Sequence, residues 1–225
     1  MDPDQTTEHP APSLADRPLR TFLDELASAA PIPGGGAAAA LAGAAAAALI
    51  AMVCNLTIGR PRYARVEAAM REILAHSEEA RARLTALIDE DAAAYQRVAA
   101  ALRLPRATDA ERAARTEAIQ QALQQAVSPP LETMRLARAL LPLCLEVAAH
   151  GNPNVVSDAG VAAELAAAAV RAASLNVRIN LMDLADADAV ARSTAEAAAI
   201  EAGLQEELDR TIGIVRAKTA PRGQG

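Results

Sequence analysis

No charged side chain occurs between Glu25 and Arg60, and this uncharged stretch constrains the fold more than any other feature of the chain. It opens with the segment Pro31-Ile-Pro-Gly-Gly-Gly36 and continues as a run of Ala, Gly and small aliphatic residues. The prolines end any preceding helix, and the glycines leave the first backbone N–H groups of a new helix uncovered. A helix that is apolar on every side is buried among other helices. The pattern therefore predicts a central buried helix from Gly35 to about Leu56.

The composition favours an all-α protein with one domain. The chain has 225 residues, of which 52% are hydrophobic and only 1% aromatic. Because β-branched and aromatic residues are few while Ala, Leu, Glu, Arg and Gln are abundant, helices are favoured over a sheet. Further helices are predicted over residues 20–28, 61–104, 108–127, 128–150 and 154–184, with a last helix around residues 204–215.

The ends of the chain are predicted to lie outside the folded domain. Residues 1–17 contain Pro and Asp and lack the apolar core of a signal peptide, so a disordered lead-in is expected there. The helical domain is predicted to span residues 18–217, and residues 218–225 are predicted to fray.

Charge and residue usage argue against several kinds of partner. The formal net charge of −6 and the scarcity of aromatic rings indicate no nucleic-acid partner. The uncharged stretch is long enough to cross a bilayer, but it is mostly Ala and Gly and has no aromatic anchors, so no membrane partner is expected. Cys54 and Cys144 are interpreted as small buried hydrophobes in a reducing compartment, with disulfide or zinc roles not expected. His76 and His150 lack ligands at metal spacing, so no metal is assigned.

Asp91 is the clearest candidate for catalysis. On a helical wheel it falls in the middle of an apolar face that also carries Leu87, Ile88 and Tyr95. A carboxylate on a packing face is costly to desolvate unless it is paired or used, and burial raises its pKa toward the range of acid–base chemistry. The alternatives are an ion pair with one of the many Arg residues, or a position facing a wet groove.

A second group of polar residues follows in the C-terminal half. Asn residues with donor and acceptor capacity suit recognition of an amide-rich heterocycle. The alternative is helix capping and hydrogen bonding between helices. The buried face of this helix is predicted along Val161, Leu165, Ala168, Ala172 and Ile179, with Asp158, Asn176 and Asp183 on it or at its edge. The group comprises Asn152, Asn154, Ser157, Asp158, Asn176, Asn180 and Asp183, and its binding candidates are Asn152, Asp158, Asn176 and Asn180.

The remaining candidates flank the uncharged helix. Gly34, Gly35 and Gly36 lack the Lys-Ser/Thr of a nucleotide P-loop, so close helix packing is the alternative to ligand binding. Asn55 and Thr57 form a polar cluster at the far end of the helix. Arg60 is a candidate for binding an anionic group, with simple solvation as the alternative.

These segments together resemble the cyclodeaminase/cyclohydrolase family, from about Leu19 to Val215. The family includes the cyclodeaminase half of formiminotransferase-cyclodeaminase and free-standing methenyltetrahydrofolate cyclohydrolases. The blocks that carry the resemblance are Pro33-Gly-Gly-Gly-Ala-Ala-Ala-Ala-Leu-Ala-Gly43, Cys54-Asn-Leu-Thr-Ile-Gly59, Ile88-Asp-Glu-Asp-Ala-Ala-Ala-Tyr95, Gly151-Asn-Pro-Asn-Val-Val-Ser-Asp-Ala-Gly160 and Ser174-Leu-Asn-Val-Arg-Ile-Asn180. The sequence departs from the family where Ala37 replaces a common serine and Arg60-Pro-Arg62 replaces a lysine-rich run.

The resemblance implies an up-and-down bundle of long helices that forms a homodimer through its helices. It also implies a cytoplasmic enzyme that acts on tetrahydrofolate adducts as substrate and needs no further cofactor. Asp89, Asp91 and Tyr95 match the acidic helix motif and are the expected catalytic residues. The expected substrate-binding residues are Gly34, Gly35, Gly36, Asn55, Thr57, Arg60, Asn152, Asp158, Asn176 and Asn180.

The expected reaction is hydrolysis of 5,10-methenyltetrahydrofolate to 10-formyltetrahydrofolate, with Asp91 as general base or acid. The first alternative is formimidoyltetrahydrofolate cyclodeaminase, which closes the same ring and releases ammonia. The second is a non-catalytic helical scaffold.

Overall fold

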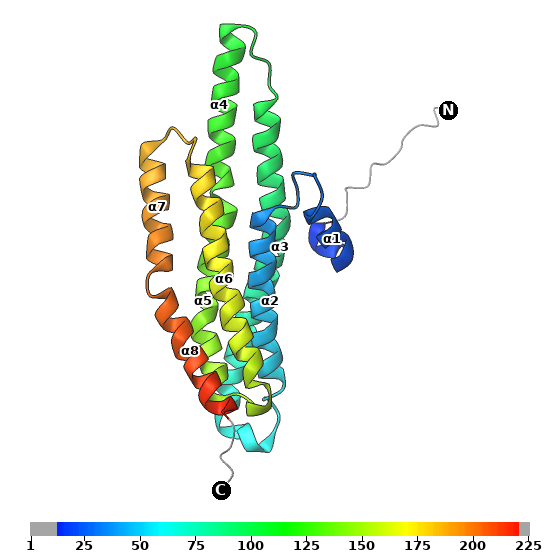
Figure 1. Cartoon of the computed structure of the whole chain (residues 1–225), viewed down its shortest axis with the longest axis vertical. Coiled ribbons are helices and arrows are strands. Elements are labelled where there is room, and N and C mark those ends of the chain that lie inside the picture. Colours follow the sequence, from blue (N-terminus) through cyan, green and yellow to red (C-terminus); the bar gives the residue numbers. More distant parts are fainter. Residues whose placement is uncertain (1–12, 221–225) are drawn as a thin grey trace, which may run out of the picture.

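The structure, a computed structural model, describes residues 13–220, and this part of the chain is helical with no strand (Figure 1). The predicted all-α bundle is confirmed. Its helices are α1 (Leu19–Leu26), α2 (Gly35–Asn55), α3 (Glu67–Leu102), α4 (Asp109–Ala126), α5 (Ser128–His150), α6 (Val156–Leu181), α7 (Ala187–Glu201) and α8 (Leu204–Thr219).

Helix α2 lies at the centre of the packing, against α3, α5 and α6. Its buried residues are almost all Ala and Gly, and Gly43 approaches a Leu84 methyl group and the Cβ of Ala169. Within residues 13–220, α2 is long and apolar enough to cross a bilayer, but most of it is buried inside the bundle. The small residues therefore serve close helix–helix packing, as the sequence predicted.

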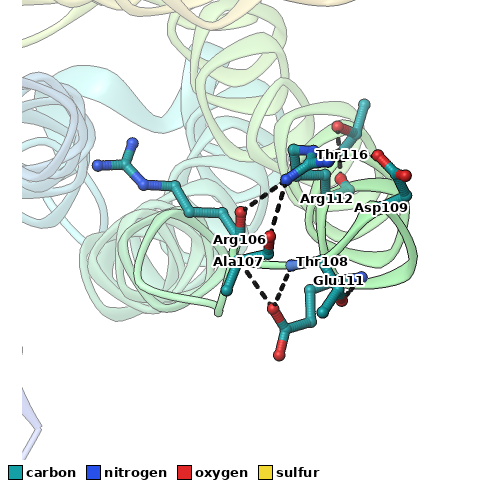
Figure 2. Close-up of polar contacts among 7 residues, drawn as sticks. All are labelled: Arg106, Ala107, Thr108, Asp109, Glu111, Arg112 and Thr116. Carbon is teal, nitrogen blue, oxygen red and sulfur yellow. Dashed lines mark hydrogen bonds and ion pairs between the residues drawn. The ribbon is translucent and has the colours of Figure 1, made fainter.

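Helix α4 begins with a capping box, which Figure 2 shows. The Thr108 hydroxyl accepts a hydrogen bond from the Glu111 N–H, and the Glu111 carboxylate accepts one from the Thr108 N–H at 2.9 Å. Arg112 donates to the carbonyls of Arg106 and Ala107, so the connection between α3 and α4 is fixed by local bonds. Together α3 and α4 extend beyond the other helices of the bundle (Figure 1).

Both predicted chain ends need correction. Residues 1–12 and 221–225 lie outside the described residues, but residues 13–17 are not a disordered lead-in. Leu14 is buried in a 3-10 turn, Leu14–Asp16, whose backbone is held by Asp89. At the other end, Lys218 donates to the carbonyls of Ala148 and Ala149 at 2.7 and 2.6 Å, so α8 stays attached to the end of α5 through Thr219.

Other boundaries also differ from the prediction. Residues Pro61–Val66 form a 3-10 helix, and the long α3 begins only at Glu67. Helix α7 was not predicted as a separate element. A turn ending at Gly203, which has a φ of 69°, separates it from α8, and glycine adopts this left-handed conformation at no steric cost.

The predicted buried face of α6 is wrong. Val161 and Ile179 are 50% and 58% exposed, and Ala168 is also exposed. The face that packs inside the bundle is instead Ala159, Ala162, Ala163, Ala166, Ala169, Val170, Ala173 and Val177. Close packing of α6 against α2 selects the small side chains for the interior and leaves the larger ones outside.

Candidate functional site

Asp91 meets the uncovered N-terminus of α2. The helix has no side-chain cap because its N-cap residue is Gly34, and the Ala37 N–H donates instead to the carboxylate of Asp91 on α3. A Cβ placed on Gly36 would overlap the carboxyl group of Asp91, so only glycine lets the two helices meet in this way. The acceptor that a Ser or Asp N-cap normally supplies thus comes from a different helix.

Two opposing effects act on the pKa of Asp91. Burial raises the pKa, because it removes water from the charged form, while the Ala37 N–H lowers it by stabilising the carboxylate. Burial is the larger effect, and the pKa lies above its ordinary value. The Asp91 carboxyl group therefore stays protonated to a higher pH than a surface aspartate, which brings its pKa closer to the range useful for acid–base catalysis.

A cavity of about 500 Å³ opens beside this carboxyl group. Its size lies within the range of small-molecule sites, roughly 300–1,000 Å³. Among residues 13–220, its charged lining residues are Asp91 and Asp183, and no Lys, Arg or His lines it. The cavity is lined by Pro31, Ile32, Gly34, Gly35, Gly36, Asp91, Ala94, Tyr95, Val98, Leu102, Leu123, Ala126, Asn176, Ile179, Asn180 and Asp183.

Several predicted site residues meet in this cavity. Besides Asp91 and the three glycines, it contains Tyr95, which is 47% exposed, and the two asparagines of α6. Asn176 lies against Gly35 and donates to the Ala172 carbonyl, while Asn180 donates to the Ala126 carbonyl at 2.7 Å. In both asparagines the amide nitrogen is bonded to the bundle, and both side chains line the cavity.

Asp89, which is expected to assist catalysis, does not line the cavity. Its carboxylate accepts hydrogen bonds from the Ser13 hydroxyl and from the Leu14 N–H, at 2.6 Å for the latter. It therefore attaches the N-terminal segment to α3.

The other predicted binding residues lie at the opposite end of α2, which spans about 30 Å at 1.5 Å per residue. The Thr57 hydroxyl accepts from the Asn152 N–H at 3.0 Å, and the Asn152 amide donates to the Leu56 carbonyl. The Tyr63 hydroxyl donates to the Asn152 side chain at 3.2 Å. Thr57 and Asn152 are therefore structural within this protomer. Asn55, Arg60 and Asp158 share this distant end, where Asn55 and Arg60 are exposed and Asp158 is half-buried.

The expected binding residues do not include Asp183, although it belongs to the polar group of this helix, and the α4 wall formed by Leu123 and Ala126 was not expected at all. The signal for the cavity was present on α3. Its apolar face continues through Tyr95, Val98 and Leu102 beyond the point where Leu84, Leu87 and Ile88 are buried. The pattern predicts that the whole apolar face of α3 packs against other helices, whereas its last turns line the cavity.

A larger groove of about 890 Å³ lies between α3 and α5, and Asp91 does not line it. Its one arginine, Arg83, is occupied by ion pairs with Glu132 at 2.5 Å and with Glu90. Residues 13–220 contain no cluster of three His, Cys, Asp or Glu that could hold a metal. Burial raises the thiol pKa to about 11 for Cys54 and about 12 for Cys144, which keeps both thiols protonated at neutral pH. The Asp91 cavity is therefore the candidate active site.

The protein is thus an all-α bundle in which a half-buried carboxylate over a helix N-terminus faces a cavity of small-molecule size lined by apolar residues and two asparagines. The sequence matches the family described as Formiminotransferase-cyclodeaminase over residues 18–199, and the chain belongs to that family. It is 46% identical over 168 residues to a methenyltetrahydrofolate cyclohydrolase of Methylorubrum extorquens, covering 75% of this chain and 81% of that protein.

Two other relatives connect the chain to cyclodeaminases. Identity to a formimidoyltransferase-cyclodeaminase of Rattus norvegicus is 40% over 177 residues, and the chain spans only 33% of that protein. The crystal structure of formiminotetrahydrofolate cyclodeaminase from Thermotoga maritima matches with a TM-score of 0.81 and 31% identity, over 91% of this chain and 98% of that one. The resemblance drawn from the sequence motifs is confirmed.

Proposed function

We propose that this chain is a methenyltetrahydrofolate cyclohydrolase, which hydrolyses 5,10-methenyltetrahydrofolate to 10-formyltetrahydrofolate. The observation that carries the proposal is the carboxylate of Asp91 in a cavity whose charged lining residues are both acidic. The substrate carries a delocalised amidinium cation, and an acidic, partly desolvated site attracts a cation. The high identity to the Methylorubrum cyclohydrolase supports the same assignment.

In the proposed reaction Asp91 acts first as base and then as acid. Its carboxylate takes a proton from a water molecule while the water oxygen bonds to the bridging carbon, which gives a neutral hydroxylated ring. The Asp91 carboxyl group then gives that proton to N5, the bond between N5 and the carbon breaks, and the new hydroxyl loses its proton to become the formyl carbonyl on N10. The overall reaction consumes one water and releases one proton.

The other cavity residues would bind and orient the substrate. Asn176 and Asn180 present amide oxygens to the N–H groups of the heterocycle. With Tyr95 as its one aromatic lining residue, the cavity would hold the ring mainly between aliphatic walls such as Val98, Leu123 and Ile179. Tyr95, at the exposed rim, would help to hold the attacking water.

We further propose that the protein is cytoplasmic and works as a homodimer. Two buried free thiols are compatible with a reducing compartment. An exposed apolar face on α6 supports dimerisation.

A cyclodeaminase activity is the second candidate, favoured by the likeness to the Thermotoga structure. One spectroscopic assay distinguishes the functions. The pure protein receives methenyltetrahydrofolate or formiminotetrahydrofolate, and the near-ultraviolet methenyl absorbance is followed together with ammonia. Loss of the absorbance faster than the spontaneous rate supports the cyclohydrolase, its appearance with ammonia supports the cyclodeaminase, and no change with either compound supports the scaffold.

Asp91→Asn and Asp89→Asn form a matched pair for this assay, two residues apart on the same helix. Asp91→Asn is expected to lower turnover by about 10²–10⁴-fold, the usual contribution of general acid–base catalysis. Its amide oxygen still accepts from the Ala37 N–H, so the fold should persist. Asp89→Asn should retain turnover because Asp89 lies outside the cavity. Full turnover in Asp91→Asn would refute the assignment of the base.

A further inference from the structure

Asp183 is the second acidic residue of the Asp91 cavity, and the proposed reaction gives it no part. It is exposed in the turn that follows α6, whereas Asp91 is half-buried on α3. Among residues 13–220 no Lys, Arg or His lines the cavity, so no cation of the lining neutralises either carboxylate. A carboxylate in a binding cavity without a cation beside it is a candidate for recognising N–H groups of a ligand.

The backbone that carries Asp183 is fixed by Gln120 of α4. The Gln120 amide donates to the Asp183 carbonyl at 2.9 Å and accepts from the Ala185 N–H at 2.7 Å. One side chain thus holds the turn between α6 and α7 through both of its polar groups, and it binds Asp183 by the backbone only. Asn180 ties the end of α6 to α4 a second time, through the Ala126 carbonyl. Asp183 therefore has a defined position at the edge of the cavity.

The polar side chains of the α6 wall favour a ligand that is rich in N–H donors. Asn176, Asn180 and Asp183 recur at spacings of four and three residues, which places them on one face of the helix. Each asparagine turns its amide nitrogen to a backbone carbonyl, so its amide oxygen is the group offered to a ligand. An ionised carboxylate only accepts hydrogen bonds. Three acceptors therefore line this wall of the cavity.

The three acceptors lead away from Asp91. Asn176 lies against Gly35, the neighbour of Gly36 at the Asp91 carboxyl group, whereas Asp183 lies at the end of α6 that contacts α4. Seven residues separate Asn176 from Asp183, a rise of about 10 Å along the helix axis. A ligand that reacts at Asp91 therefore reaches Asp183 with a part of the molecule several bonds away from the reacting atom.

We propose, on the basis of the folate substrate proposed above, that Asp183 sets the orientation of the substrate by binding the 2-amino group and the N3–H of its pyrimidinone ring. In that substrate the reacting carbon bridges N5 and N10, and the amino-pyrimidinone edge lies on the far side of the fused ring. The two N–H donors of this edge are parallel, so one carboxylate accepts both, as it does from an arginine. The glutamyl tail at the other end of the substrate carries carboxylates, which Asp183 repels. Asp183 thus attracts the ring end and disfavours the reversed orientation.

A double-mutant cycle between protein and ligand tests this contact. The wild type and Asp183→Ala receive the methenyl substrate and its analogue with a methyl group in place of the 2-amino group. In the wild type, loss of the amino group should lower kcat/KM about 10–100-fold, the range for a hydrogen bond to a charged group. Asp183→Ala should lose a similar factor with the natural substrate through a higher KM, at an unchanged melting temperature. This variant should then use both compounds about equally well.

Two further variants separate a direct contact from charge and from structure. Asp188→Ala is the matched control for charge, because Asp188 is exposed in the first turn of α7 and does not line the cavity. Its kcat/KM should equal that of the wild type with both compounds. Gln120→Ala releases the turn that carries Asp183, so it should raise KM for the natural substrate, leave kcat unchanged and have little effect on the 2-methyl analogue. Gln120 is thereby a positioning residue for Asp183.

The outcomes decide between binding at Asp183 and the alternatives. An equal penalty for loss of the amino group in the wild type and in Asp183→Ala overturns the proposal, because the amino group is then bound elsewhere. An equal loss of kcat/KM in Asp183→Ala and Asp188→Ala also overturns it, because the effect is then general attraction of the cationic substrate. An inactive wild type refutes the proposed function instead. The same cycle, measured as dissociation constants of tetrahydrofolate and its 2-methyl analogue, then decides the contact.

Discussion

Gly36→Ala is the most direct test of the contact between Asp91 and α2. The new Cβ would overlap the Asp91 carboxyl group, so the carboxylate must move away from the Ala37 N–H. Loss of a hydrogen bond to a charged group costs roughly 1.5–3 kcal/mol, whereas Ala in place of Gly regains about 0.4–1 kcal/mol through the unfolded chain. The expected net effect is a loss of about 1–2 kcal/mol in the free energy of unfolding, with kcat/KM lowered about 10²-fold by the displaced base.

Gly35→Ala is the matched control. Its Cβ would lie 3.6 Å from Oδ1 of Asn176, an ordinary contact, so this variant should be as stable as the wild type or slightly more stable. Urea unfolding and the methenyl assay measure both effects. In an Asp91→Ala background the carboxyl group is gone, and Gly36→Ala should become stabilising. If Gly36→Ala is as stable and active as Gly35→Ala in the wild-type background, Asp91 does not cap α2.

Four further predictions concern protonation and packing. Because the pKa of Asp91 is raised, kcat/KM should fall with decreasing pH along a limb whose midpoint lies above the ordinary aspartate value of about 3.9; a midpoint below it would contradict the burial argument. The same raised pKa favours the folded state at low pH and loses that contribution as the pH rises through it, so urea titrations at pH 7 should find Asp91→Asn at least as stable as the wild type. Thr57→Val leaves the buried Asn152 N–H without its acceptor and should lower the free energy of unfolding in urea by about 1–3 kcal/mol. An unchanged urea midpoint would show that this hydrogen bond does not stabilise the fold. Lys218→Met removes two hydrogen bonds to the end of α5 and should lower the free energy of unfolding by about 1–2 kcal/mol in the same assay. Unchanged stability would instead support the prediction from the sequence that the chain frays from residue 218.

In the sequence, the residues that point to the cavity are those that break a local pattern. Asp91 interrupts an apolar face, and the run Gly34–Gly36 leaves a helix without a cap, so both features had to be explained by a neighbour. In the structure the two features explain each other, because the Asp91 carboxylate accepts the hydrogen bond of the Ala37 N–H at the uncapped start of α2. Asn176 and Asn180 of α6 line the same cavity as Asp91.

Side-chain size misled the prediction where α6 is rich in Ala on several sides. Large residues such as Val161 and Ile179 were assigned to the interior, although close packing against α2 favours Ala there. Asp89 could not be separated from Asp91 by composition, since its partners Ser13 and Leu14 belong to a segment expected to be disordered. Thr57 and Asn152, which match family motifs, lie about 30 Å from the cavity along α2. The far end of the helix was the expected place for Thr57, but the bond that joins Asn152 to it links segments far apart in the sequence.

Because Asp91 of α3 supplies the N-terminal cap of α2, the protonation state of the proposed base is coupled to the backbone of that helix. Whenever Asp91 carries a proton, the first turn of α2 faces a neutral carboxylic acid in place of an anion, and the attraction of its helix dipole is weakened. The amide of Ala37 thereby reports the protonation state of the base, and its chemical shift would titrate together with catalysis.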